Sequence, residues 1–305
     1  MKQRYLKSGG LIAIVSPSGK VADDIVTKSV ELIEAEGYRV EVMPNVLGHA
    51  TGVFSATDRE RANDLREAII RDDIDAIICA RGGYGAVRTL QTLGTDVMRW
   101  CNKWLVGFSD ITALHSSLSR YGWSSLHGPM LKHIAEKGMH SEDVEKMFAV
   151  MRGDSLRVEC DAMEGSRDGQ SQSVVTGGNL SLVYSLRSTP ADIYPDGKIL
   201  FIEDLSEYNY HVDRMMQNLR YSGVLERING LIVGNLTNMK DGSTAYGKDA
   251  AGIIAEAVAP YNYPVLIGYP AGHGGGVNMP LVLGAKATMT VENGKAVVEW
   301  SREDY

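Results

Sequence analysis

The stretch KWLVGFSDITALHSSL, residues 103–118, holds the pattern that decides the fold. Its apolar start predicts a buried strand that ends at Gly107, and the residues after the turn have the spacing of an amphipathic helix. Strand-like and helix-like runs alternate in the same way through the first half, as in GLIAIVSPSG (10–19) and DDIVTKSVELIEAEGY (23–38). This alternation is typical of βαβ units, so the sequence predicts an α/β fold with a parallel sheet.

Three loops follow predicted strands and are expected to share one edge of that sheet. They are Ser16–Gly19, Arg81–Gly85 and Gly107–Asp110. In open α/β sheets, ligands bind in the crevice outside the carboxyl ends of the strands. We therefore expect the functional site at this edge.

The second half has its own strand-like runs, among them KILFIEDL (198–205), INGLIVGNL (228–236) and YPVLIGYP (263–270). Between the halves, the polar and Gly/Ser-rich segment EGSRDGQSQS (164–173) has no helix or strand period. We predict an N-terminal domain over 1–155, a linker over 156–169 and a C-terminal domain over 170–305. Near the end, Asn293-Gly294 between two alternating runs predicts a β-hairpin.

The composition limits the class of protein. Hydrophobic residues make up 44% of the 305 residues and charged residues 23%, as in globular proteins. A net charge of −7 argues against a nucleic-acid partner, which would require clustered Lys and Arg. The apolar run at 11–15 is too short for a secretion signal, and no run reaches the roughly 18 apolar residues that span a membrane. We expect a cytoplasmic protein with a small-molecule or peptide partner and no membrane contact.

Metal, cofactor and disulfide sites are not expected. Cys79, Cys101 and Cys160 are odd in number and widely spaced, which predicts burial as small apolar groups. The sequence has no HExxH, HxH or CxxC motif, and SPSGKV (16–21) lacks the remaining residues of a phosphate-binding P-loop.

Ser109 has two interpretations. Serine between a strand and a helix is a good N-cap, which is the usual role of such a residue. Two details weaken this interpretation: Thr112 stands where a capping box would have Glu or Gln, and Gly107 permits the tight turn that exposes a nucleophile. The full G-x-S-x-G pattern is broken by Ile111.

The loop ARGGYG (80–85) carries three glycines in four positions, so its amides can approach a ligand closely. One amide of this loop and that of Asp110 would provide the two donors that acyl transfer needs. An ordinary turn and a phosphate site are the alternatives.

An acid and an imidazole complete the set of candidates. Glu203 stands at the end of an apolar run, where a solvated or capping acid is as common as a catalytic one. His273 lies in GYPAGHGGGVN (268–278), among glycines that offer it little packing. His115 would face away from the helix N-terminus and is interpreted as structural, while His127 stays open. Sequence alone does not show that Ser109, Glu203 and His273 meet.

At these residues the chain resembles the LD-carboxypeptidase family of serine peptidases, family S66. The matching motifs include ICARGGYG (78–85), VGFSDITALH (106–115), TGGNLSLV (176–183) and FIEDLSEYNYHVDRM (201–215). The resemblance implies a triad of Ser109, Glu203 and His273, with an oxyanion hole from the amides of Gly83 and Asp110. It also implies an N-terminal domain like class I glutamine amidotransferases, a smaller β-rich α/β C-terminal domain, and a homodimer.

The family activity implied for this chain is release of the terminal D-alanine from L,D-linked muropeptide tetrapeptides in cytoplasmic cell-wall recycling, without metal. A substrate carboxylate would then need a partner, for which Arg81 and Asn179 are the candidates. Two alternatives stay open. One is a peptidase of the microcin C immunity type that cleaves peptidyl-nucleotide or aminoacyl-nucleotide conjugates, and the other is a non-catalytic peptide-binding relative.

Overall fold

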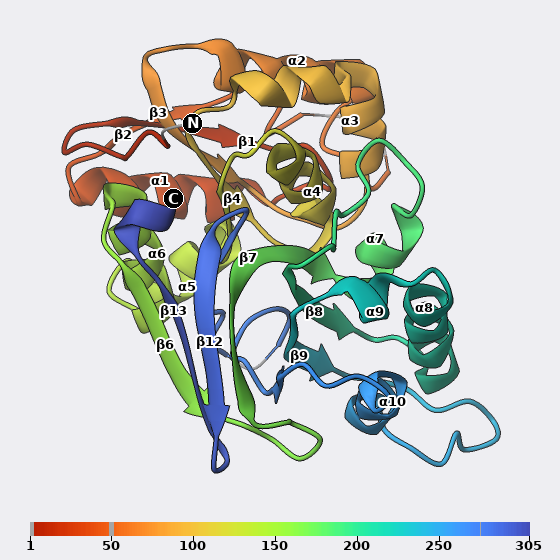
Figure 1. The fold of residues 1–305 in the computed structure, drawn as a ribbon. Helices are drawn as coiled ribbons and strands as arrows, with labels where there is room; N and C mark the ends of the chain where they lie inside the picture. The colour runs from red at the N-terminus through yellow and green to blue at the C-terminus, as the bar shows by residue number, and fades with distance from the viewer. Residues whose placement is uncertain (1–2, 49–51, 275) are drawn as a thin grey trace.

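The computed structural model describes residues 3–48, 52–274 and 276–305. The chain forms two β-sheets with helices packed on them, and Figure 1 shows the sheets as neighbouring layers of one structure. The α/β fold class predicted from the sequence is confirmed.

The first sheet has six strands in the order β11-β5-β4-β3-β1-β2. Five of them run parallel: β1 (Leu11–Val15), β2 (Arg39–Val42), β3 (Ile74–Cys79), β4 (Trp104–Gly107) and β5 (Ser125–His127). Every residue of β1, β3 and β4 is buried, because helices cover both faces of the sheet. The continuous apolar runs in the sequence therefore predicted this parallel sheet correctly.

Helices from the first half of the chain flank this sheet. Helix α1 (Asp23–Ala35) packs with α5 (Leu131–Lys137), and α2 (Asp58–Ile70) packs with α3 (Ala86–Leu93). Figure 1 shows the α2–α3 pair and the α1–α5 pair on opposite sides of the strands. The remaining helices of this half are α4 (Thr112–Arg120) and α6 (Glu142–Arg152).

The second sheet has seven strands in the order β10-β9-β8-β7-β12-β13-β6. The strand β7 (Gly169–Asn179) joins a parallel part to an antiparallel part, since it pairs parallel with β8 and antiparallel with β12. The parallel part contains β8 (Ile199–Leu205), β9 (Gly230–Thr237) and β10 (Val265–Ile267). The helices of this half are α7 (Leu180–Ser185), α8 (Asn209–Tyr221), α9 (Val224–Arg227) and α10 (Ala250–Val258).

The antiparallel part corrects the predicted linker over 156–169. Leu156–Asp161 form strand β6, which pairs with β13 (Lys295–Trp300) in the second sheet. Residues of β6 alternate between buried and exposed, so the strand lies at a half-solvated sheet edge and its apolar content is low. The outer limits of the two predicted domains, 1–155 and 170–305, stay a prediction.

The predicted hairpin is present. Strand β12 (Lys286–Glu292) pairs antiparallel with β13, and Asn293 and Gly294 in the turn both have positive φ angles, 52° and 76°. Two positive φ angles are the mark of the turn that matches the twist of paired strands.

The two sheets share one hydrophobic core. The larger buried apolar cluster contains Trp104 of β4 and Phe201 of β8, so it crosses from one half of the chain to the other. The short strand β11 (Leu281–Leu283) also crosses, because it pairs with β5 of the first sheet. Cys79 and Cys101 are fully buried as predicted, whereas Cys160 on β6 is half-buried.

Candidate active site

Ser109 occupies a sharp turn between β4 and α4. It begins a short 3-10 helix, Ser109–Ile111, and its φ angle is +64°, a left-handed conformation that costs free energy in a residue with a side chain. The N-cap position of that helix belongs to Phe108, and the side chain of Ser109 caps no amide. The capping interpretation of Ser109 is therefore wrong, and its hydroxyl is available for another partner.

That partner is His273. The Nε2 atom of His273 lies 3.0 Å from Oγ of Ser109, and its Nδ1 atom lies 2.8 Å from Oε2 of Glu203. Ser109 follows β4, Glu203 lies near the end of β8, and His273 lies in the loop after β10. The structure thus brings together the three residues that the sequence singled out, in one hydrogen-bonded line.

Glu203 is buried completely behind His273. Its Oε2 also accepts the backbone N–H of His273 at 3.0 Å, and its Oε1 accepts Nδ2 of Asn179 at 3.3 Å. Gly272 makes this approach possible, because a Cβ atom there would lie 2.5 Å from Oε2 of Glu203.

The prediction that Asn179 binds a substrate carboxylate does not agree with its position. Asn179 is buried, and its Nδ2 donates to Glu203 and, at 2.9 Å, to Oδ1 of Asp204. Its Oδ1 accepts the amide of Leu182 and caps α7. A polar residue after a strand was a sound candidate from the sequence, but this side chain points into the protein and supports Glu203.

The electrostatics favour a proton on the imidazole. Burial by itself lowers the pKa of His273, but the hydrogen bond and negative charge of Glu203, with the charge of Asp204, outweigh it and raise the pKa above 6.5. A raised pKa means that His273 takes up a proton more readily than a free imidazole does. His273 is therefore suited to act as a base.

The glycine loop after β3 approaches Ser109 most closely at Gly82. A Cβ atom on Gly82 would lie 2.9 Å from Cβ and 3.2 Å from Oγ of Ser109. Gly83, the residue predicted from the family pattern, has a φ angle of +98° and lines the same cavity as Ser109. Gly82 was not among the predicted site residues, although the run of glycines was the signal that a close approach occurs here.

The carboxylate of Asp110 holds this loop in place. Its Oδ2 accepts the hydroxyl of Ser18 at 2.6 Å and the amide of Ala86 at 2.7 Å. Burial raises the pKa of the Asp110 carboxyl, while these two hydrogen bonds oppose that rise. Asp110 thus joins the three loops that the sequence placed at one edge of the sheet, and that expectation is confirmed.

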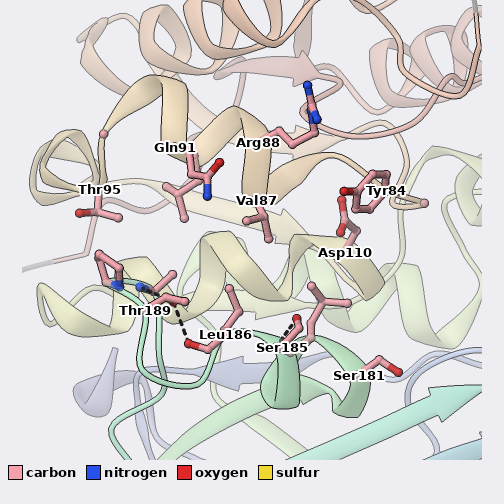
Figure 2. A pocket seen from close by; sticks show the side chains of 16 residues that line it. Tyr84, Val87, Arg88, Gln91, Thr95, Asp110, Ser181, Ser185, Leu186 and Thr189 are labelled. Atoms are coloured by element: carbon pink, nitrogen blue, oxygen red, sulfur yellow. Dashed lines mark hydrogen bonds between the residues drawn. The ribbon is translucent and has the colours of Figure 1, made fainter.

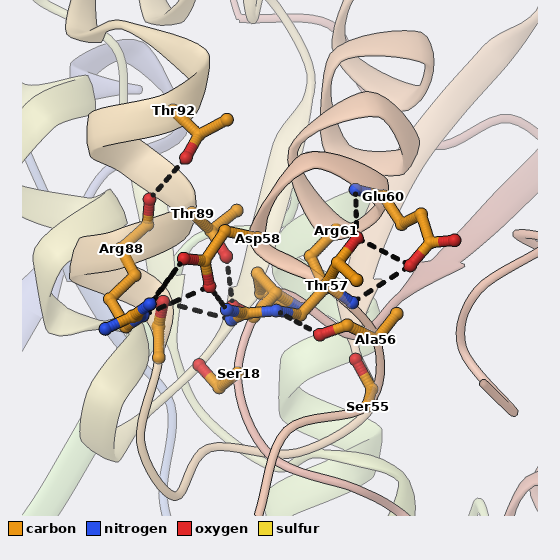
Figure 3. Close-up of polar contacts among 12 residues, drawn as sticks. Ser18, Ser55, Ala56, Thr57, Asp58, Glu60, Arg61, Arg88, Thr89 and Thr92 are labelled. Atoms are coloured by element: carbon orange, nitrogen blue, oxygen red, sulfur yellow. Dashed lines mark hydrogen bonds and ion pairs between the residues drawn. The ribbon is translucent and has the colours of Figure 1, made fainter. Parts of the chain in front are cut away.

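A buried arginine reinforces the same loops (Figure 3). The Nη1 atom of Arg61 donates to the carbonyl oxygens of Pro17 at 2.6 Å and Gly85 at 3.0 Å, and Nη2 pairs with Asp58. Arg88 in turn contacts the other side of Asp58, at 2.7 Å. Arg61 was not predicted from the sequence, because nothing in a helical sequence distinguishes a buried guanidinium from an exposed one.

A cavity of about 730 Å³ opens beside Ser109 and His273. The apolar part of its wall includes Ile25 and Met130, and the basic side chains of Arg81 and Lys132 also line it. Among the described residues of this lining, none is Asp or Glu. The cavity is therefore suited to a ligand with a negative charge and a small apolar group.

Two other histidines near the site, His115 and His127, are structural. The ring of His115 is buried, with Nε2 2.9 Å from the carbonyl oxygen of Gly107 and Nδ1 2.9 Å from Oγ of Ser125, as its structural interpretation predicted. His127, which the sequence left open, is fully buried and packs edge-on against Phe201. Burial lowers the pKa of both imidazoles, that of His115 to about 4.

The described residues contain no group of three or more His, Cys, Asp or Glu side chains placed to hold a metal ion. No helix in the described ranges has the length and apolar content needed to cross a membrane.

Comparisons with known proteins agree along the whole chain. Two family models match: the LD-carboxypeptidase N-terminal domain over residues 12–128 and the LD-carboxypeptidase C-terminal domain over residues 172–289. The protein of Bacillus subtilis named probable murein peptide carboxypeptidase is 28% identical, over 98% of this chain and 94% of its own. The murein tetrapeptide carboxypeptidase of Pseudomonas aeruginosa is 25% identical, over 89% of this chain and 91% of its own.

Solved structures of carboxypeptidase and self-immunity proteins have the same fold as this chain. The muramoyltetrapeptide carboxypeptidase from Oxalobacter formigenes has a TM-score of 0.86 at 28% identity, covering 95% of this chain and 98% of the other. The microcin C7 self-immunity protein, in complex with glutamyl sulfamoyl guanosine, shares the fold with a TM-score of 0.83 at 20% identity, covering 98% of each chain. Because the models of both domains match, the chain belongs to the LD-carboxypeptidase family.

Proposed function

We propose that this chain is a serine-type LD-carboxypeptidase that releases the terminal D-alanine from L,D-linked muropeptide tetrapeptides through an acyl-enzyme on Ser109. The observation that carries the proposal is the unbroken line of hydrogen bonds from Ser109 through His273 to Glu203. Two curated relatives named for murein peptides support the choice of substrate.

In the first step, Oγ of Ser109 attacks the carbonyl carbon of the bond to D-alanine, and Nε2 of His273 takes the hydroxyl proton. Glu203 accepts a hydrogen bond from Nδ1–H of His273 throughout, which leaves Nε2 free to act as the base and stabilises the imidazolium that forms. The carbonyl oxygen becomes an oxyanion. The amides of Gly83 and Asp110 are the proposed donors to it, and loss of one such donor costs roughly 10²–10³-fold in kcat.

In the second step, the carbon–nitrogen bond breaks and Nε2 of His273 gives its proton to the leaving amine of D-alanine. Water then attacks the ester on Ser109, His273 takes a proton from that water, and Oγ regains a proton as the shortened peptide leaves. Apart from water, every group used in these steps belongs to the chain or to the substrate. Arg81 and Lys132 line the catalytic cavity, and none of its described lining residues is Asp or Glu. This charge supports a substrate with a free terminal carboxylate.

The experiment is to incubate the purified protein with muropeptide tetrapeptides that carry diaminopimelate or lysine at the third position, and to assay free D-alanine. Ser109→Ala is expected to abolish release. A matched control is Ser119→Ala, because Ser119 lies on α4 away from the cavity. Rapid quenching followed by mass spectrometry should show a peptide adduct on Ser109 in the wild type only.

Three results would contradict the proposal. Release that survives Ser109→Ala would exclude Ser109 as the nucleophile. Cleavage of an aminoacyl-nucleotide analogue without release from tetrapeptides would favour the immunity-type activity. Binding of the tetrapeptide without turnover would favour a non-catalytic relative.

The proposed cytoplasmic setting and homodimer rest on family resemblance, and sedimentation of the purified protein tests the dimer.

A further inference from the structure

A second cavity borders the catalytic one and has no part in the mechanism above. It is a groove of about 850 Å³ between α3 and α7. Figure 2 shows Val87 and Gln91 of α3 on one side of it, with Ser185 of α7 and the next residue, Leu186, on the other. The two walls come from different halves of the chain, so the groove exists only in the folded protein.

The groove meets the catalytic cavity at Gly83, which lines both. Gly83 has no side chain, and it belongs to the loop whose amides face the reacting carbonyl in the proposed mechanism. A substrate held at Ser109 would therefore pass over Gly83 to enter the groove.

The proton transfer from His273 decides which end of the substrate extends over Gly83 into the groove. His273 gives its proton to the leaving amine, so the leaving residue must lie on the side of His273. Both His273 and Gly274 line the catalytic cavity, and neither belongs to the lining of the groove. The acyl side of the substrate then extends in the other direction, past Gly83.

We infer that the groove between α3 and α7 binds the acyl side of the substrate, as an extended peptide of about three residues. This inference rests on the proposed peptidase function. Helix α3, which forms one wall, has eight residues and is about 12 Å long at 1.5 Å per residue. Three extended residues span about 10 Å.

The chemistry of the lining fits a peptide chain. Apolar side chains such as Leu90 and Leu182 alternate with neutral polar ones such as Gln91 and Thr189. Amide and hydroxyl groups of this kind pair with peptide N–H and C=O groups, and the apolar surface takes side-chain methylene groups. The one guanidinium among these residues belongs to Arg88, which already pairs with Asp58.

The wall of the groove is also held in place. The first amide of α3, that of Ala86, donates to Asp110, next to Ser109 in sequence. The carbonyl of Gly85 accepts from Arg61. Because these bonds tie α3 to the loop at Ser109, peptide bound in the groove is held in register with the nucleophile.

The test is to fill the groove with a large side chain and to compare hydrolysis of substrates of two lengths. Gln91→Trp places an indole between the walls, while Thr92→Trp puts the same group on the neighbouring exposed position of α3, which does not line the groove. Each variant is assayed with the tetrapeptide that the wild type hydrolyses, and with the acetylated dipeptide that has the same two terminal residues.

In the wild type, kcat/KM should be at least about tenfold higher for the tetrapeptide than for the dipeptide. Gln91→Trp should lower kcat/KM for the tetrapeptide about tenfold more than for the dipeptide, whose shorter acyl side fills less of the groove, and Thr92→Trp should change neither. Equal rates on both lengths in the wild type, or an equal loss on both lengths in Gln91→Trp, would overturn the subsite. A wild type that hydrolyses neither peptide would instead contradict the proposed function.

Discussion

His273 donates two hydrogen bonds to a single oxygen of Glu203, from Nδ1 at 2.8 Å and from its own backbone N–H at 3.0 Å. One carboxylate oxygen thus holds the imidazole and the loop that carries it. Gly272 permits the contact, since no side chain stands between that loop and Glu203. The orientation of the base and the conformation of its loop therefore depend on the same group.

Replacing Glu203 with Gln should lower kcat by about 10⁴-fold, because the amide does not hold the correct imidazole tautomer. It should also move the pH profile. Only neutral His273 accepts the Ser109 proton, so wild-type kcat/KM should fall as pH drops through the raised pKa of His273, above 6.5. Without the charge of Glu203, this acid limb should move to lower pH. If kcat/KM of the variant falls over the same acidic pH range as in the wild type, a group other than His273 is titrating.

Gly272→Ala should lower kcat by about 10²-fold, because displacement of a catalytic group by an ångström has an effect of that size. Its Cβ atom would meet Oε2 of Glu203 at 2.5 Å, and its φ angle is +103°. Gly37→Ala is the matched control, with a positive φ angle of +84° and no atom within 4 Å of the new Cβ. The control should lose about 1–3 kcal/mol of stability and keep its activity. Equal activity in the two variants would contradict this role of Gly272.

Arg61→Ala should lower the free energy of unfolding by about 3–5 kcal/mol, since it leaves Asp58 half-paired and buried carbonyl groups without a donor. Arg88→Gln removes the exposed partner of the same Asp58 and should cost no more than about 1 kcal/mol. Chemical denaturation of both variants measures the difference. Similar losses would show that burial of Arg61 is unimportant.

The buried ring of His115 should make stability depend on pH. Its folded pKa of about 4 is lower than the ordinary 6.5, so the unfolded chain binds the extra proton between these values. Stability from this group is present above pH 6.5 and is lost as pH falls towards 4, by about 3 kcal/mol in total. His115→Gln should flatten the pH dependence of unfolding in this window.

Arg81→Gln should raise KM for the tetrapeptide about tenfold and leave kcat nearly unchanged, because a charge-assisted bond to the terminal carboxylate is lost. Arg81 lines the cavity and donates to the carbonyl oxygen of Lys20 at 2.7 Å. Peptides with a C-terminal amide should not distinguish the variant from the wild type. Arg59→Gln, at an exposed position on α2, is the control. An equal rise in KM for peptides with a C-terminal carboxylate and with a C-terminal amide would contradict carboxylate binding by Arg81.

Local pattern predicted much of this structure, because the features concerned depend on neighbours in the chain. Continuous apolar runs such as Leu11–Val15 could only be strands covered on both faces. Asn293-Gly294 determined its hairpin through the two positive φ angles it adopts. Ser109, Glu203 and His273 were singled out because each lies at or after the end of a predicted strand, where functional residues of α/β folds collect, and the family resemblance implied that they form a triad.

Other features could not be read locally. The strand β6 lies at an edge where half its side chains meet water, so its sequence has no apolar run. Asn179 and Arg61 look like surface residues until the fold buries them. Gly82 and Gly83 look equivalent in the sequence, and only the fold places Gly82 against Ser109.

The sequence by itself determined the order of strands and helices and the residues able to do the chemistry, since these follow from side-chain type and short-range spacing. Only the tertiary structure decided that Ser109 faces His273 rather than its own helix, because its partner lies 164 positions away along the chain. It also decided which groups support the site. Hydrogen bonds and burial depend on distances in space, and those are set only when the two sheets pack on their shared core.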